Sequence, residues 1–565
     1  MPELFPQTAG ANAVRLNEEL RRVERLPRRL WEPYAEALAG ELTALLKTAS
    51  GTMRLRPLQA VALVEIGIDG GLFGPLRVGA GKTLITLLAP VVAFAARPLL
   101  IVPASLVSKT CHDIALFRRH WTIPDQRIIS YEWLGRVQAA KWLDEYNPDL
   151  LIADEVHRLK NPRAAVTRRV RRFMGANPDT KFVGMSGTVT KRSILDFAHI
   201  LRWTHKPHAA PLPSTFSDLE LWADALDERK GQLRRADPAA LLVFANADEL
   251  THEPRKAARL AFRRRLVETP GVVASKETPI DASIVVSAIE VEPTAAITAA
   301  FERLRGAWET PDEHPIADGL SMFRHARELA LGFFYVWNPR PPREWLDARR
   351  EWSAYVRSVL ARSRTLDSEL QVRQRDAHGD ECQAWLAVRD SFEPNTEPRW
   401  IDESILDACA AWAKSNTGII WTEHTCFAER LSVKTGLPYY GRRGLCGARP
   451  IEKHRKGSLI ASIASNSTGR NLQAWSQNLI TSMPANGMQT EQLFGRTHRD
   501  GQTADEVRFD VITTCAEHVG AFWQVWRDCE FVFDATGSPQ KLLLADHDMP
   551  TATTLALRSG ALWNK

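Results

Sequence analysis

Short apolar runs, each ending in polar residues and each followed by a stretch of helical periodicity, constrain the fold of this chain more than any other feature. In chain order the runs are 97–105, 127–134, 148–155, 180–188, 417–423, 457–465, 477–484 and 507–514. Runs of this kind are typical of buried strands. Their alternation with helices is typical of a parallel sheet with helices on both faces and a ligand site at the carboxyl ends of the strands. The sequence therefore predicts an α/β fold with two parallel-sheet lobes.

The sequence between and around these runs sets the expected domain boundaries. Residues 205–400 are charged, bear many tryptophans and show helical periodicity, with one strand-like run at 282–292. This stretch is predicted to be a large, mainly helical insertion between the lobes. The expected domains are an N-terminal helical segment (1–50), a first lobe (51–204), the insertion (205–400), a second lobe (401–540) and a C-terminal tail (541–565).

Length and composition narrow the class of protein. A chain of 565 residues is too long for one hydrophobic core, and 44% hydrophobic with 25% charged residues is ordinary for a globular protein. No apolar run approaches about 18 residues and the N-terminus lacks a signal pattern, so we expect neither membrane insertion nor secretion. Seven scattered cysteines, none in CxxC spacing, favour a reducing compartment and argue against structural zinc. The net charge of +6 permits a nucleic-acid partner without requiring one.

A glycine-rich turn leads into an apolar helix at RVGAGKTLITLL, residues 77–88. Lys82 is predicted to reach the β and γ phosphates of a nucleotide, and the Thr83 hydroxyl to ligate Mg²⁺. Backbone N–H groups from three residues are predicted to face phosphate oxygens: Gly79, Ala80 and Gly81. Leu76 stands where the P-loop pattern has its first glycine, so the match is truncated and needs a second element.

That second element is DLLIADEVHRLKN, residues 149–161, in which an acidic pair ends an apolar strand. Asp154 is predicted to hold Mg²⁺, directly or through water, and Glu155 to polarise the attacking water as a general base. A pair of acids that caps the next helix is the alternative reading of such a tetrapeptide alone. Its occurrence with a GKT sequence in the same α/β region favours the nucleotide site.

The stretch QLFGRTHRDGQ, residues 492–502, carries Arg496 and Arg499 three residues apart. Phosphoryl transfer requires positive charge at the γ-phosphate as the transition state develops. If the second lobe closes over the first, both arginines can enter from the far side of one nucleotide. The hydrolysis state of that nucleotide would then control whether the cleft is closed, as in a motor.

Taken together, these motifs resemble those of superfamily-two helicases, and among them the Swi/Snf-type DNA translocases, over roughly residues 53–535. DEVHRLKN differs from that family's DEAHRLKN only at Val156, and QLFGRTHRDGQ fits Q-x-x-G-R-x-H-R-x-G-Q at every fixed position. The resemblance implies two RecA-like lobes that bind ATP and Mg²⁺ between them, with Gln59 of LRPLQ reading adenine and Gln492 also at the nucleotide. It further implies a set of residues that couple hydrolysis to movement: His157, Ser186, Gly187 and Thr188.

Nucleic acid is expected along loops that follow strands in both lobes. The candidate contacts are Pro103, Ser105, Lys109, Thr422, His424, Ser467, Thr468 and Arg470. Short hydroxyl and backbone N–H groups bind phosphates without reading bases, which suits a motor that steps along any sequence. Each residue alone fits a helix cap or a turn equally well. The arginine-rich stretch at 162–174 fits a solvated helix face better than a DNA contact. For the stretch at 256–266, contact with a DNA duplex remains open. The tryptophans are best explained as packing residues.

The leading hypothesis is an ATP-driven translocase on double-stranded DNA in the cytoplasm of a prokaryotic or phage-infected cell. A strand-separating or annealing helicase on DNA or RNA is the first alternative, because the wedge that splits strands has no fixed motif. A nucleic-acid-binding scaffold whose ATPase has decayed is the alternative of another class. Single-stranded DNA and RNA thus stay open as tracks, and the sequence indicates neither protein partners nor the direction of travel.

Overall fold

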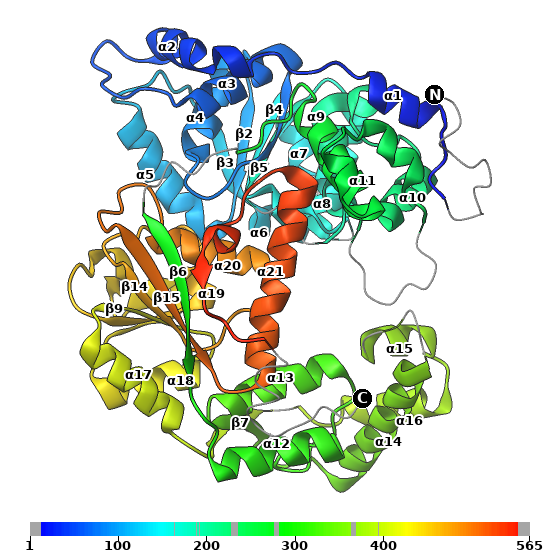
Figure 1. Ribbon diagram of the computed structural model, residues 1–565, viewed down its shortest axis with the longest axis vertical. Helices are drawn as coiled ribbons and strands as arrows, with labels where there is room; N and C mark the ends of the chain where they lie inside the picture. Colours follow the sequence, from blue (N-terminus) through cyan, green and yellow to red (C-terminus); the bar gives the residue numbers. More distant parts are fainter. Residues whose placement is uncertain are drawn as a thin grey trace.

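The fold is described from a computed structural model of the chain. The described residues are 13–139, 141–162, 164–187, 189–190, 192–227, 236–275, 282–362, 366, 369–393 and 395–551. Figure 1 shows two parallel sheets, one above the other, with a separate group of helices beneath them. The predicted α/β class with two parallel sheets is confirmed.

The first sheet has five parallel strands in the order β1-β5-β4-β2-β3. Its strands are β1 (Gly71–Pro75), β2 (Pro98–Val102), β3 (Arg127–Ser130), β4 (Leu150–Asp154) and β5 (Lys181–Ser186). Successive side chains of a strand point to opposite faces, so Leu151 and Ala153 enter one core and Leu150 and Ile152 the other. Because both faces are buried, the strands read as continuous apolar runs, and the four predicted in this region are found.

Helices cover both faces of the first sheet. One face carries α2 (Ala35–Leu46), α3 (Pro57–Asp69), α4 (Lys82–Val92) and α5 (Val107–Phe117). The other carries α1 (Glu18–Arg25), α6 (Tyr131–Leu134), α7 (Trp142–Tyr146), α8 (Ala165–Ala176), α9 (Leu195–Ala209), α10 (Phe216–Leu226) and α11 (Pro254–Val267). The last two helices lie in the predicted insertion, yet they share a core with the first sheet.

The second sheet has seven parallel strands in the order β10-β13-β9-β14-β15-β6-β16. They are β10 (Tyr439–Tyr440), β13 (Leu459–Ser462), β9 (Gly418–Thr422), β14 (Gln477–Ile480), β15 (Glu506–Thr513), β6 (Ser283–Glu290) and β16 (Asp546–His547). Helices α17 (Ser404–Ser415) and α18 (Thr425–Thr435) pack against one face of this sheet. Helices α20 (Gly487–Thr497) and α21 (Ala516–Thr536) pack against the other face. A short α19 (Ile463–Asn466) follows β13.

Two strands of this sheet come from segments that the sequence analysis placed elsewhere. The run at 282–292 was expected inside the helical insertion, but β6 pairs along its whole length with β15. The tail at 541–565 was expected outside the lobe, but β16 pairs with β6. Pairing partners depend on the tertiary fold, which the local pattern of a strand does not encode.

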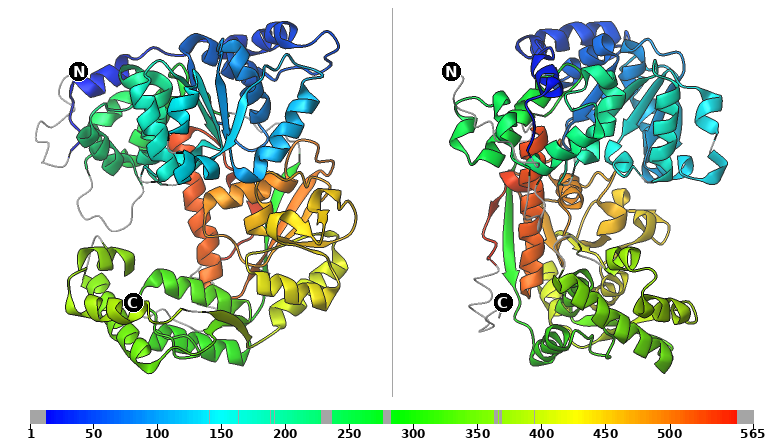
Figure 2. Two further views of the ribbon diagram at one scale, coloured as in Figure 1. Left: turned by 180° about the vertical axis from the view of Figure 1, so that it is seen from behind. Right: turned by 90° about the vertical axis from the view of Figure 1, so that its right-hand side faces the viewer.

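The rest of the predicted insertion forms its own group. It contains α12 (Ala295–Ala307), α13 (Gly319–Ala330), α14 (Arg343–Arg362), α15 (Glu369–Arg375) and α16 (Asp380–Arg389). It also contains an antiparallel pair that the sequence analysis did not predict, β7 (Phe333–Trp337) and β8 (Thr396–Trp400). Figure 2 shows this group below the second sheet, with the long helix α21 running from α11 down to α13.

Among the described residues, no helix combines the length and the apolar character needed to cross a bilayer.

Candidate functional site

A cavity of about 480 Å³ lies between the two sheets. On the side of the first sheet, helices and loops line it with Gln59, Gly79, Gly81, Lys82, Thr83, Asp154 and Glu155. On the side of the second sheet, it is lined by Gly469, Asn471, Arg496 and Arg499, among others. The glycine-rich loop, the acidic pair and the two arginines were predicted from separate stretches of sequence. The structure brings all three into one cavity.

The glycine-rich loop needs its glycines for two reasons. Gly79 has φ of 92° and Gly81 has φ of 76°, a left-handed backbone that residues with a Cβ rarely adopt. A Cβ at Gly81 would also lie only 2.2 Å from Nε2 of Gln59. Helix α4 begins directly after this turn at Lys82, and the first residues of the helix line the cavity.

Two side chains fix the glycine-rich loop through hydrogen bonds to its backbone. Nζ of Lys82 donates to the carbonyls of Leu76 at 2.9 Å and Arg77 at 3.1 Å. Gln59 accepts from the backbone N–H of Arg56 at 2.9 Å and donates to the carbonyl of Gly81 at 3.1 Å. Gln59 therefore fixes the shape of the loop as well as lining the cavity.

The acidic pair follows β4 on a constrained turn. Glu155 has φ of 56°, a left-handed conformation that is uncommon for a residue other than glycine and that recurs at functional sites. Its Oε2 accepts from the Ser186 hydroxyl at 3.1 Å and lies 3.2 Å from Nδ1 of His157. Nδ1 of His157 also lies 2.9 Å from Oγ of Ser186. Two of the residues predicted to couple hydrolysis to movement thus directly hold the carboxylate of Glu155.

The two carboxyls of the pair differ in pKa. Burial, together with the neighbouring charge of Glu155, raises the pKa of Asp154. Burial also acts to raise the pKa of Glu155, but the hydrogen bond from His157 and the charge of Lys82 outweigh it and lower this pKa. Glu155 is therefore the carboxyl of the pair whose ionised form its surroundings favour.

Both arginines are engaged by backbone carbonyls at the edge of the cavity. Arg496, 5% exposed, donates through Nε to the carbonyl of Gln492 at 2.7 Å and through Nη1 to that of Arg470 at 3.2 Å. Arg499 donates through Nη1 to the same Arg470 carbonyl at 3.1 Å and to Oδ1 of Asn471 at 2.6 Å. Burial and the nearby charge of Arg499 lower the pKa of Arg496 to about 10, which leaves it charged at neutral pH.

The Nε atom of Arg499 is buried and has no hydrogen-bond partner among the described residues. A buried donor without a partner, on a half-buried cation that lines a cavity, is complementary to an anion within it. The residues present therefore fit a polyphosphate. Thr83 and Asp154 supply the hydroxyl and single carboxylate with which Mg²⁺ is commonly bound when phosphates complete its shell.

The remaining nucleotide-site predictions lie around the cavity. Gln492 is outside the lining, where its Oε1 accepts from the Thr468 hydroxyl at 2.9 Å. Ala80 is buried in the loop, and the carbonyl of Gly187 accepts from Nε2 of Gln540 at 3.2 Å, which joins the two sheets. Thr188 lies outside the described residues.

Of the eight predicted nucleic-acid contacts, three are buried, four are partly exposed and one is exposed. Thr422 is 1% exposed, and the ring of His424 packs 5.2 Å from that of Phe333. Lys109 pairs with Asp113 at 3.2 Å and lines the nucleotide cavity instead.

Others have their side chains occupied or covered. Pro103 and Ser467 are buried, Thr468 donates to Gln492, and the guanidinium of Arg470 pairs with Glu452 at 2.6 Å. Among the eight predicted contacts Ser105 alone is exposed. The others are buried or partly exposed with contacts to neighbouring residues, and their contact with a nucleic acid stays a prediction.

Sequence reasoning missed a buried network behind the arginines. Nζ of Lys541 lies 3.0 Å from Nδ1 of His498, and the backbone N–H of Lys541 donates to Oε2 of Glu491 at 2.6 Å. Burial lowers the pKa of Lys541 to about 8. The fixed histidine of the arginine motif was a signal that this position has a partner, but nothing in the tail pointed to Lys541.

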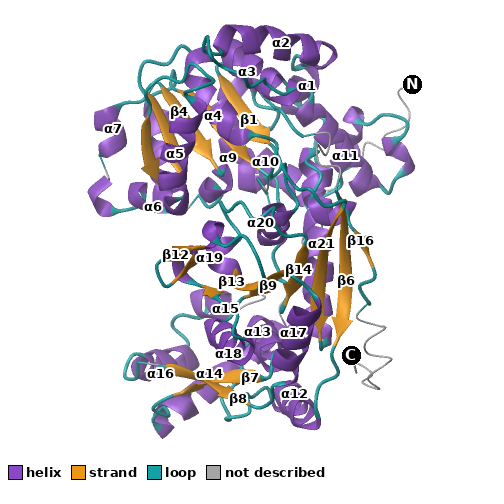
Figure 3. Cartoon of the chain, turned by 90° about the vertical axis from the view of Figure 1, so that its left-hand side faces the viewer, coloured by secondary structure: helices purple, strands orange, loops and turns teal. Residues whose placement is uncertain are grey.

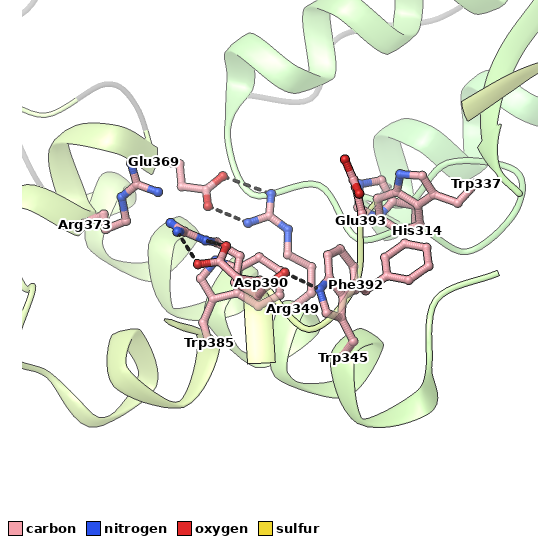
Figure 4. A pocket seen from close by; sticks show the side chains of 11 residues that line it. His314, Trp337, Trp345, Arg349, Glu369, Arg373, Trp385, Asp390, Phe392 and Glu393 are labelled. Atoms are coloured by element: carbon pink, nitrogen blue, oxygen red, sulfur yellow. Dashed lines mark hydrogen bonds and ion pairs between the residues drawn. The ribbon is translucent and has the colours of Figure 1, made fainter. Parts of the chain in front are cut away.

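A second cavity, of about 550 Å³, lies within the helical group (Figure 4). Its walls are aromatic rings that pack on one another, with Trp345 4.9 Å from Trp337 and 4.8 Å from Trp385 between ring centroids. The central guanidinium of Arg349 is paired with Glu369 through two hydrogen bonds. These tryptophans form the core of the helical group, as expected for packing residues.

A scan of the chain against protein-family models found no match, and a search of curated proteins found no relative.

Proposed function

We propose that this chain is an ATP-driven motor that moves on double-stranded DNA. The observation that carries the proposal is the convergence of a GKT loop, an acidic pair and two arginines, contributed by two different sheets, on one cavity. In the proposed fold each sheet is the centre of a RecA-like lobe, and the group α12–α16 is an insertion in the second. The cleft between the lobes then binds one ATP and closes around it.

The chain's own residues divide the chemistry among them. Lys82 and the N–H groups of the loop would bind the β and γ phosphates, and Thr83 with Asp154 would hold Mg²⁺, which neutralises phosphate charge when bound. Glu155, held ionised by His157 and Ser186, would orient the attacking water and polarise its O–H bond. Arg496 and Arg499 approach from the second sheet, where their charge would stabilise the transition state.

Movement would follow because the site is complete only when both sheets meet. The arginines belong to one sheet and the loop and acidic pair to the other, so binding energy from ATP favours the closed arrangement. Release of phosphate removes that preference and lets the cleft open. Cycles of closing and opening are what a two-lobe motor needs in order to step along a track.

The test is ATP turnover measured without nucleic acid and with single-stranded DNA, duplex DNA and RNA, alongside a strand-displacement assay. Duplex DNA is expected to raise turnover at least ~10-fold, equivalent to about 1.4 kcal/mol of barrier. Stimulation by RNA only would overturn the duplex translocase, and strand displacement would favour the helicase alternative.

The scaffold alternative is tested with Glu155→Gln. This variant should still bind ATP but lose turnover, whereas Glu145→Gln, at an exposed glutamate on α7, should hydrolyse ATP as the wild type does. A wild-type chain that binds DNA but shows the same residual turnover as Glu155→Gln would be a scaffold.

A further inference from the structure

Residues 442–456, between β10 and β13, form a basic segment that we call the basic hairpin. Its strands β11 (Leu445–Cys446) and β12 (Arg449–Pro450) pair antiparallel. Within these residues lie six cations and one acid, Glu452. The cations are Arg442, Arg443, Arg449, Lys453, Arg455 and Lys456. The segment therefore carries a charge of +5, close to the +6 of the entire chain.

All six cations of the basic hairpin are exposed, and none forms an ion pair with a described residue. Elsewhere the arginines of this chain commonly face carboxylates, as Arg430 faces Glu403 and Arg349 faces Glu369. Unpaired like charges at close quarters repel one another, so a cluster of this kind favours a polyanionic partner. Figure 3 shows β12 beside α19, at the end of the second sheet opposite β16.

The basic hairpin is connected to the arginines of the candidate site through Arg470. The side chain of Arg470 reaches the hairpin, where it pairs with Glu452 and donates to the carbonyl of Arg443. Its own carbonyl, at the other end of the residue, accepts from Arg496 and Arg499. A displacement of the hairpin therefore acts on the same residue that positions both guanidinium groups.

We propose that the basic hairpin binds the phosphate backbone of nucleic acid and that Arg470 transmits this binding to Arg496 and Arg499. The inference rests on the proposed function, since it takes the nucleic-acid track as the partner. Arginine forks suit phosphate oxygens and do not require particular bases, so the contact is independent of sequence. An anionic membrane would also attract cations, but membrane-binding segments add large exposed apolar anchors. In the basic hairpin, Leu445 is the only large apolar residue that is exposed.

The surface is tested with the triple variant Arg442→Gln, Arg449→Gln and Arg455→Gln. The matched control is Arg15→Gln, Arg21→Gln and Arg25→Gln, which removes the same charge from exposed arginines at and before α1 that have no ion pair with a described residue. Affinity for a duplex is measured without ATP over a range of salt concentrations. Each lost phosphate contact lowers the slope of log affinity against log salt by about 0.9, so the hairpin variant should lose about 2–3 in slope.

The control should keep the wild-type slope, and turnover without DNA should be unchanged in both variants. Equal slopes in the hairpin variant and the control would overturn the inference while leaving the proposed motor intact if the wild type is still stimulated by duplex. A wild type that binds no nucleic acid would overturn both. Hairpin-dependent binding to vesicles containing phosphatidylserine, with duplex affinity unchanged, would also overturn the inference.

The link through Arg470 is tested with Glu452→Gln, which removes the ion pair but keeps all six cations. Duplex affinity should stay within ~3-fold of the wild type or tighten, because the variant removes a negative charge from the binding surface. Stimulation of turnover by duplex should fall at least ~10-fold, equivalent to about 1.4 kcal/mol. Full stimulation in Glu452→Gln would show that the hairpin binds the track without positioning the arginines.

Discussion

Acid should destabilise this protein through His498, the histidine that stands between Arg496 and Arg499. His498 is 2% exposed, and its two ring nitrogens have different partners. Nε2 lies 2.8 Å from the carbonyl of Ala282, so this nitrogen must carry the hydrogen. Nδ1 then accepts from Nζ of Lys541 at 3.0 Å. Protonation would place an N–H of the imidazolium against the ammonium of Lys541.

The size of the destabilisation in acid follows from the pKa of His498. Burial, and next the positive charge of Lys541 with a further contribution from Arg77, lowers this pKa to about 4 from an ordinary value of 6.5. That difference corresponds to about 3 kcal/mol of unfolding free energy. Since the unfolded chain takes up the proton first, this stability is complete above pH 6.5 and is lost as the pH falls from 6.5 to about 4. For a cooperative unit of about 150–250 residues, the loss would lower Tm by roughly 6–12 °C.

The assay is calorimetric melting of the wild type and of His498→Gln between pH 4 and 8, with His252→Gln at an exposed histidine as the control. His498→Gln should melt lower at pH 7, because a glutamine does not reproduce both hydrogen bonds, but its Tm should fall less with acid. His314 and His518, whose pKa values burial lowers to about 3, contribute equally to all three proteins and cancel in the comparison. An equally steep fall in His498→Gln would refute the reasoning.

Three further changes test the candidate site. Lys82→Ala should weaken nucleotide binding and turnover together, since it removes the charge that faces the phosphates. Arg499→Ala should lower turnover by roughly 10³–10⁵ while nucleotide affinity stays within ~10-fold, and Arg499→Lys should not restore the rate because an ammonium lacks the planar fork; normal turnover in a folded Arg499→Ala would exclude Arg499 as the finger. Gly81→Ala should weaken nucleotide binding, since alanine is strained at φ of 76° and its Cβ would displace Gln59, whereas Gly175→Ala, which meets no atom within 4 Å, should bind nucleotide normally.

The strands were predictable where burial alone decides them. The apolar runs of both sheets appear in the structure because their residues are covered on both faces, where apolar side chains predominate. Strand β1, with the sequence GLFGP, was missed because glycine and proline weaken any strand pattern. Strand β7 was missed because FFYVW stands among helical stretches and its partner β8 is almost wholly exposed.

The two halves of the site differed in how far sequence could reach. Phosphate chemistry requires particular residue types at short spacing, so Lys82, Asp154 and Arg499 could be predicted from short motifs that support one another. Contact with a nucleic-acid backbone requires only exposed donors, and exposure depends on which neighbours cover a residue. Thr422 is buried by its surroundings, whereas the cations of the basic hairpin are left uncovered. The charge of that hairpin was visible in the sequence, but its freedom from ion pairs was not.

Gly495 and Gln502 of QLFGRTHRDGQ are explained by close packing and hydrogen bonding, and their role bears on how the arginines reach the cavity. Gly495 lies within α20, so it does not serve to relax the backbone. A Cβ there would lie 2.5 Å from Cγ1 of Val78 in the glycine-rich loop, so glycine is what allows the helix to approach that loop. Gln502 donates to the carbonyls of Trp475 and Thr497, both at 3.0 Å, and so fixes the chain just beyond the helix. One contiguous stretch therefore contains both Gly495, which allows α20 to approach the glycine-rich loop, and the two arginines that line the cavity.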